Sequence, residues 1–244
     1  MMRLNRFLAR AGIASRRKSD DLILEGAVVV NGATVVELGF CVDPASDSVE
    51  FEGQLVSLPD FCEYFLLNKP RGYVVTRCDT HGRSTVFDLV DGQRLGTMPV
   101  GRLDMDTTGI LIWTDDGELA HRLLHPSYLI DKVYEAVVRG VPSIESLTKL
   151  REGIVLDDGL TAPADIEIID IQGVGYRQTA CVRLVIHEGR KRQVRRMLRS
   201  VGHPVRALRR VGFAGLILAG VPEGATRSLS NDEIKDLREQ VGLV

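Results

Sequence analysis

The chain has 244 residues, 44% of them hydrophobic and 26% charged, with a formal net charge of −2 at pH 7. These values are ordinary for a globular protein of one large or two small domains, and without a run of about eighteen apolar residues we expect no membrane span. The N-terminus has no secretory pattern, and four dispersed cysteines without a C-x-x-C pair favour neither disulfides nor zinc. A reducing cytoplasm is therefore the expected compartment.

Basic residues gather in two segments of the chain. Residues 1–24 hold six Lys and Arg against two acids, and residues 187–210 hold nine against one. The rest of the chain is strongly acidic, so the near-neutral total conceals two cationic segments on an acidic body. This asymmetry predicts localised binding of a polyanion. The alternative is that these charges lie on solvated helix faces.

The first sixty residues predict a small module of two helices and a hairpin-rich sheet. Apolar residues at helical spacing indicate a helix over 4–11, and Ser15 is a plausible N-cap for a second helix. Basic residues 16–18 in its first turn oppose the helix dipole, which is easier to understand if phosphates bind there. Strands follow at 28–30, 34–36 and 48–51, with Asn31-Gly32 as a tight turn. Residues 56–62 are interpreted as a junction to a second domain.

The remaining chain mixes strands and helices without a regular βαβ rhythm. Strands are expected at 64–67, 73–76, 110–113, 132–138, 166–169, 180–186 and 205–211. Helices are expected at 118–124, from Ser143 through 150, at 190–199, and from Ser230 toward the end of the chain. Several strand pairs are hairpin-like, so the pattern predicts an α+β fold with a largely antiparallel or mixed sheet.

The stretch 101–117 places polar residues between apolar ones. Its apolar run, 110–113, lies between Gly109 and Asp115-Asp116-Gly117 and predicts a short buried strand. The polar cluster before it, which holds Asp104 and Thr107, is then a loop at the end of that strand. Binding and catalytic groups concentrate in such loops. The structural alternative is an Asx or Thr turn, in which Asp104 and Thr107 bond nearby amides.

Three motifs and the N-terminal module together resemble one enzyme family, the small-subunit and large-subunit ribosomal RNA pseudouridine synthases. The motifs are Gly101-Arg102-Leu103-Asp104 with Thr107, Gly109 and Asp116-Gly117; Lys132-Val133-Tyr134; and Glu188-Gly189-Arg190-Lys191-Arg192-Gln193-Val194-Arg195-Arg196-Met197. The third is more similar to the large-subunit branch. The module from Arg3 through Ser15-Arg16-Arg17 to Val30-Asn31-Gly32 is similar to the RNA-binding fold first seen in the fourth small-subunit ribosomal protein.

This resemblance implies two domains. A small N-terminal α/β RNA-binding domain would occupy residues 1–60. A pseudouridine synthase domain with a central mixed, largely antiparallel sheet would occupy residues 61–244. The implied partner is ribosomal RNA or a pre-ribosomal particle. Large-subunit RNA is favoured over small-subunit RNA. The resemblance implies neither a cofactor nor a metal, and we expect a monomer with no membrane partner.

The resemblance also implies roles for individual residues. Asp104 would be the catalytic carboxylate, acting at the ribose of a uridine, and Arg195 would pair with it. Tyr134 would lie against the uracil and could serve in proton transfer. Arg102 would help to occupy the space that a flipped nucleotide leaves. The predicted RNA-binding residues are Arg3, Arg16, Arg17, Lys18, Lys69, Arg102, Thr107, Lys132, Arg190, Lys191, Arg192, Gln193 and Arg196.

The chemistry suits these residue types. The target atoms of a uridine are not reachable in stacked RNA, so the base must leave the stack, at a cost of a few kcal/mol. An ionised carboxylate can then attack the anomeric carbon or take a proton from the ribose, and a guanidinium keeps it charged. Two alternatives are a non-catalytic assembly factor that binds ribosomal RNA and a glycosidase that pairs Asp104 with Asp106 or Asp116. The first leaves the motif set unexplained, and the second leaves the N-terminal module unexplained.

Overall fold

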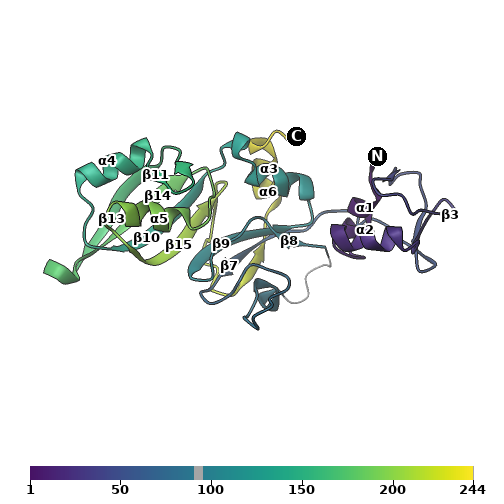
Figure 1. Ribbon diagram of the computed structural model, residues 1–244, viewed down its shortest axis with the longest axis horizontal. Coiled ribbons are helices and arrows are strands. Elements are labelled where there is room, and N and C mark those ends of the chain that lie inside the picture. Colours follow the sequence, from purple (N-terminus) through teal and green to yellow (C-terminus); the bar gives the residue numbers. More distant parts are fainter. Residues whose placement is uncertain (91–95, 244) are drawn as a thin grey trace. The chain divides into compact units, whose positions relative to one another are not determined.

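The computed structural model describes residues 1–90 and 96–243. The chain divides into two compact units (Figure 1). Of the described residues, unit 1 contains 1–63, 96–98 and 114–116, and unit 2 contains 64–90, 99–113 and 117–243. None of the helices in the described part of the chain has the length and apolar character needed to cross a bilayer.

Unit 1 has the predicted helices and hairpin. Its elements are β1 (Met2–Arg3), α1 (Leu4–Arg10), α2 (Arg16–Leu24), β2 (Val28–Val30), β3 (Ala33–Thr34), β4 (Cys41–Val42), β5 (Val49–Phe51) and β6 (Gln54–Leu55). The Ser15 side chain caps α2 by accepting a hydrogen bond from Lys18 N, as its sequence position predicted. Strands β1 and β4 pair with each other, and the other four strands form a sheet in the order β3-β2-β5-β6. The buried side chains of α1, α2 and these strands make one apolar core.

Unit 2 is built on one long mixed sheet in the order β13-β14-β10-β15-β9-β7-β17. The pairs β13–β14, β14–β10, β10–β15 and β7–β17 are antiparallel, and β15–β9 is parallel. The predicted mixed and largely antiparallel sheet is thus confirmed. These strands are β7 (Tyr64–Lys69), β9 (Thr107–Thr114), β10 (Lys132–Arg139), β13 (Asp165–Gln172), β14 (Thr179–Ile186), β15 (Val205–Phe213) and β17 (Thr226–Ser228).

The remaining elements of unit 2 are helices and short strands. The helices are α3 (Gly117–Leu124), α4 (Ile144–Glu152), α5 (Gln193–Ser200) and α6 (Asn231–Gln240). The short strands are β11 (Val155–Leu156), β12 (Gly159–Leu160) and β16 (Leu216–Ile217), and β8 (Met98–Pro99) has one residue in each unit. Ser143 and Ser230 cap α4 and α6 through their side chains, which confirms both predicted helix starts.

Helices α4 and α5 cover one face of the β13–β14–β10–β15 half of the sheet (Figure 1). The alternating burial along β10 shows why: Tyr134, Ala136 and Val138 lie on the covered face, whereas Glu135 and Val137 lie on the other. On α5, Val194, Met197 and Leu198 pack into the same core. The cationic side of α5 is therefore left outside this core.

The two halves of the sheet meet where β9 pairs with β15. Gly109 lies opposite Arg210 in this parallel pair and has a φ of +108°. A Cβ at Gly109 would overlap the carbonyl oxygen of Arg210, so only glycine allows this approach. The buried Arg210 guanidinium crosses the same junction and donates to Ile110 O from Nε and Nη2 at 2.9 and 2.7 Å. This junction fixes the end of the 101–106 loop.

Four local predictions were wrong. The strand expected at 34–36 ends at Thr34, and Val35 and Val36 lie outside β3. Residues 73–76 form no strand, and only Val74 makes an isolated bridge, to Thr85. The helix expected from residue 190 begins at Gln193, because Arg192 adopts a left-handed conformation with a φ of +52°. Thr107 and Thr108, expected in the loop, already belong to β9, since their pairing with β15 extends the strand toward the N-terminus.

Candidate active site

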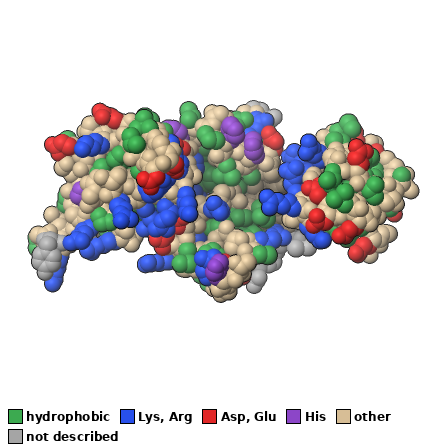
Figure 2. Space-filling view, in the orientation of Figure 1, with side chains coloured by type: hydrophobic (Ala, Val, Ile, Leu, Met, Phe, Trp, Pro, Cys, Tyr) green, Lys and Arg blue, Asp and Glu red, His purple; other side chains and the backbone are tan. Residues whose placement is uncertain are grey.

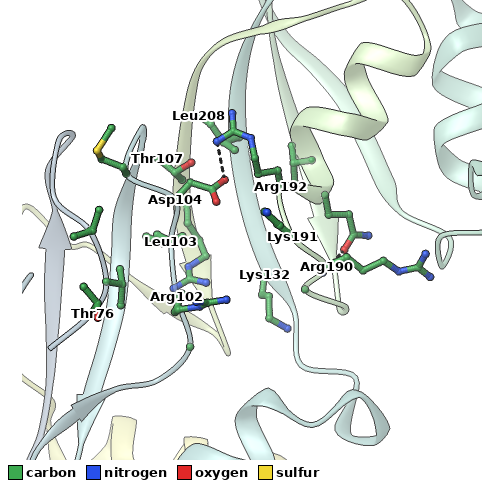
Figure 3. Close-up of a pocket in the computed structure, with 18 of the residues that line it drawn as sticks. Thr76, Arg102, Leu103, Asp104, Thr107, Lys132, Arg190, Lys191, Arg192 and Leu208 are labelled. Carbon is green, nitrogen blue, oxygen red and sulfur yellow. Dashed lines mark hydrogen bonds and ion pairs between the residues drawn. The ribbon is translucent and has the colours of Figure 1, made fainter. Parts of the chain in front are cut away.

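A cavity of about 1090 Å³ opens in unit 2 beside the 101–107 loop (Figure 3). Its walls come from that loop, from residues 74–83, from β10 and β15, and from the turn 186–194 that leads into α5. Figure 2 shows Lys and Arg side chains gathered near α5 on the face of unit 2 turned toward the viewer. The cavity, called here the cleft, thus joins a carboxylate-bearing loop to a cationic segment.

Asp104 presents its carboxylate to the cleft. The carboxylate faces Arg192 across the cavity, with Oδ2 at 3.7 Å from Nη1 (Figure 3). The backbone carbonyl of Asp104 accepts from Thr107 N at 3.0 Å and from Lys69 Nζ at 3.2 Å. A turn is therefore present, but it is closed by the backbone. The Asp104 side chain, 31% exposed, remains available to a ligand.

Asp106 holds the two arginines at this end of α5. Its carboxylate lies 3.2 Å from Arg192 Nη1 and 3.2 Å from Arg195 Nη2. Burial would raise the pKa of Asp106, but the hydrogen bond from Arg192 and the charge of Arg195 outweigh it and hold the pKa below its usual value. The sequence suggested Asp106 only as a glycosidase partner of Asp104. Its position two residues after Asp104 was the available signal for a role in the site.

Arg195 does not pair with Asp104 as expected. Its Nη2 bonds Asp106, donates to the Asp106 carbonyl at 2.9 Å and approaches Thr107 Oγ1 at 3.4 Å. The correction has a geometric cause, because Arg192, in its left-handed conformation before α5, takes the position facing Asp104. Burial lowers the pKa of Arg195, yet a guanidinium remains charged. Arg195 therefore holds the start of β9 and lies outside the lining of the cleft.

Tyr134 lines the same cleft as Asp104. It lies on β10 between Arg210 of β15 and Leu184 of β14 in the sheet register, and 9% of its surface is exposed. Its ring packs in the core that contains Leu103 and Val194. The structure thus brings Asp104 and Tyr134 to one cavity.

Two of the predicted RNA-binding lysines are buried. Lys69 is fully buried on β7, and its Nζ donates to the carbonyls of Pro70, Asp104 and Thr107 at 3.0–3.2 Å. Lys132 is 6% exposed and donates to the carbonyls of Ile130 and His187. Burial lowers the pKa of each to about 8. Lys69 was predicted to bind RNA, but in the structure its ammonium group is buried and holds the Asp104 loop.

Four further residues of the predicted RNA-binding set form hydrogen bonds or ion pairs with other residues of the chain. Arg190 bonds Glu188 and the carbonyls of Gly159 and Leu160, and Gln193 bonds Glu188. Arg196 pairs with Asp158 at 2.8 Å. These bonds join the turn before α5 to the β11–β12 hairpin. Thr107 is 2% exposed and accepts from Arg195. These four residues thus contact the walls of the cleft, and their binding of RNA stays a prediction.

The other predicted RNA-binding residues are exposed. Arg102, Lys191 and Arg192 line the cleft of unit 2 (Figure 3). Arg3, Arg16, Arg17 and Lys18 are exposed in unit 1. The described residues contain no group of three or more His, Cys, Asp or Glu arranged to hold a metal ion.

Comparison with known proteins gives a consistent result along the chain. The RNA pseudouridylate synthase model matches residues 63–200, and the S4 domain model matches residues 2–47. The ribosomal large subunit pseudouridine synthase B of Bacillus subtilis is 46% identical over 98% of this chain and 96% of its own. The protein of the same name from Pseudomonas aeruginosa is 40% identical over 99% of this chain and 63% of its own. A crystal structure of a pseudouridylate synthase superposes with a TM-score of 0.68 at 31% identity, covering 97% of this chain and all of that one.

Proposed function

This chain belongs to the RNA pseudouridylate synthase family, and on that basis we propose that it converts a uridine of large-subunit ribosomal RNA to pseudouridine. Two similar proteins that bear the name of a large-subunit enzyme support this choice of substrate. The S4 domain at residues 2–47 supplies an RNA-binding module with exposed cations. The target uridine would enter the cleft of unit 2.

The observation that carries the catalytic assignment is that Asp104 and Tyr134 line one cavity. The Asp104 carboxylate would act at the ribose, either by attack on the anomeric carbon or by removal of a ribose proton. The Tyr134 ring would lie against the uracil, and its hydroxyl would serve in proton transfer. The reaction breaks one C–N bond and forms one C–C bond to the same sugar, so it is redox-neutral.

The surrounding arginines have separate roles in this proposal. Arg192, 3.7 Å from Asp104, would help to hold the direction of the carboxylate. Arg195 would act as a positioning residue, because it holds Asp106 and Thr107 behind the Asp104 loop. The exposed Arg102 would occupy the space that the flipped nucleotide leaves. Phosphate contacts from the exposed cations would offset the few kcal/mol that unstacking costs.

Mapping of pseudouridines in ribosomal RNA tests this proposal. Cells that lack the protein should lose pseudouridine at one or a few positions of the large-subunit RNA, and the wild-type chain should restore it. The Asp104→Asn variant should restore none while its RNA affinity stays within a few-fold, because phosphate contacts dominate affinity. If the pseudouridine map is the same in cells with and without the protein, the alternative of a non-catalytic assembly factor is favoured.

A further inference from the structure

A second cavity, of about 260 Å³, lies in unit 2 on the sheet face opposite the cleft. Along β15, Leu208 and Arg210 point toward the covered side of the sheet, whereas Arg206, Ala207 and Arg209 are exposed. Leu208 of β15 lines both cavities. This second cavity is called here the rear groove.

Three arginines from two separate elements line the rear groove. Arg206 and Arg209 come from β15, and Arg71 comes from the turn after β7. All three are exposed, and within the described part of the chain none has a carboxylate at ion-pair distance. Three like charges around one hollow repel each other. A bound anion would offset this repulsion.

The acidic side chains of the groove are already bonded to other arginines. Asp106 is held by Arg192 and Arg195. Glu135 lies opposite both Arg209 and Arg183 in the sheet register, yet its carboxylate bonds Arg183, at 3.2 Å. The charges of Asp106 and Glu135 are thus balanced by residues outside the set of three. The guanidiniums of Arg71, Arg206 and Arg209 keep their donors for an external ligand.

The groove lies next to the loop that carries Asp104, and a backbone hydrogen bond joins the two. Gly72, next to Arg71, donates its backbone N–H to the carbonyl of Met105 at 2.8 Å. Asp104 faces the cleft, and Asp106, two residues later, lines the groove. An anion bound by Arg71 would therefore lie beside the loop that positions the proposed catalytic carboxylate.

We infer that the rear groove binds phosphodiester groups of the same RNA whose uridine enters the cleft. The inference rests on the proposed function for the identity of the polyanion. Guanidinium groups match the geometry of phosphate oxygens and hold them through paired hydrogen bonds. The RNA that flanks the target nucleotide would thus be bound on both sides of the β9–β15 junction. Binding on both sides would orient the RNA strand before the base is flipped.

The test is RNA binding by the double variant Arg206→Gln/Arg209→Gln in the full chain. Affinity for a large-subunit ribosomal RNA fragment is measured by titration over a range of KCl concentrations. Because the variant cannot neutralise two of the phosphates, affinity should fall roughly tenfold or more near physiological salt, and the slope of log K on log salt should become shallower by about 1.4–1.8. The variant Arg206→Lys/Arg209→Lys, which retains both charges, should recover most of the affinity.

A matched control removes two positive charges outside the rear groove. Lys149→Gln/Lys235→Gln changes two exposed lysines, on α4 and α6, and should leave affinity and salt slope as in the wild type. Equal effects of the control and the groove variant would overturn the inference, because net charge would then explain both. The inference would also be overturned if the groove variant unfolds thermally like the wild type and has an unchanged slope of log K on log salt.

Turnover separates this inference from the proposed function. In the groove variant KM for RNA should rise while kcat stays unchanged, since the arginines bind RNA away from the reacting atoms. A fall in kcat alone would place the arginines in the chemistry and overturn the groove as a binding site. Failure of the wild type to form pseudouridine would refute the proposed function, whereas the binding titration would still decide the groove.

Discussion

Asp104 and Asp106 are two residues apart but lie in different surroundings. The Asp106 carboxylate is bonded by both Arg192 and Arg195, whereas Asp104 has one guanidinium, at 3.7 Å. A carboxylate bound on both sides is poorly placed to react. A partly exposed carboxylate with a single guanidinium nearby is accessible to a ligand. We therefore assign Asp106 to holding the arginines and Asp104 to the reaction.

Asp106→Asn tests this division. The change removes the charge that holds Arg192 and Arg195, and a small displacement of a catalytic loop can cost about a hundredfold in rate. We expect kcat to fall roughly tenfold to a hundredfold, with RNA affinity unchanged within a few-fold. Single-turnover kinetics measure the rate of pseudouridine formation. The companion variant Asp104→Asn should have no activity, and equal activity of Asp106→Asn and the wild type would refute the positioning role.

The buried Lys69 should make folding stability depend on pH. Its pKa is about 8 in the folded chain, below the ordinary 10.5. Between these values the unfolded chain binds more protons, so the free energy of unfolding should rise with pH over this window. Urea unfolding of the wild type and of Lys69→Met, at several pH values from about 7 to 10, isolates the effect. The stability difference should move in favour of the wild type as pH rises, and parallel curves would contradict the assignment.

Among the elements, the β9–β15 pair has the strictest sequence requirement. Gly109 has a φ of +108°, and an added Cβ would meet the Arg210 carbonyl. Gly109→Ala should therefore lower the free energy of unfolding by about 1–3 kcal/mol or more, the usual cost of overpacking with backbone strain. It should also reduce activity in the fraction that folds, because β9 carries the end of the Asp104 loop.

Gly117→Ala is the matched control for this change. Gly117 begins α3, a Cβ added to it would have no atom within 4 Å, and its φ lies outside the left-handed region. Alanine also favours a helix over glycine. Chemical denaturation should thus show wild-type or slightly higher stability for Gly117→Ala. Wild-type stability of Gly109→Ala, as expected for Gly117→Ala, would show that the junction tolerates a side chain at position 109.

Across the whole molecule, the cations of the two units should both contribute to RNA binding. Arg16, Arg17 and Lys18 are exposed in the first turn of α2, where they can act together with free backbone amides on phosphates. Replacing all three by Gln should weaken binding of ribosomal RNA and make the salt slope shallower by up to about 2–2.7. Filter binding at several KCl concentrations measures both. An unchanged slope would remove α2 from the RNA-binding surface.

Much of the fold follows from local chemistry. The caps at Ser15, Ser143 and Ser230, the Asn31-Gly32 turn and the alternation along β10 were predicted correctly, because each depends on residues within a few positions. The start of α5 was misplaced by three residues, since Arg192, which bonds Asp106 far away in the chain, has a left-handed conformation that local sequence did not indicate. The catalytic roles of Asp104, Tyr134 and Arg195 remain predictions to be tested by the variants above.

Periodicity and caps in the amino-acid chain were enough to predict most of the elements, and the motifs carried the family resemblance, which implied the site residues Asp104 and Tyr134. They could not predict that Arg195 bonds Asp106, that Lys69 is buried under the loop, or that Arg71 joins Arg206 and Arg209. These arrangements join residues that are distant in sequence. Their partners are chosen by sheet register and by competition among several nearby charges, and both exist only once the chain has folded.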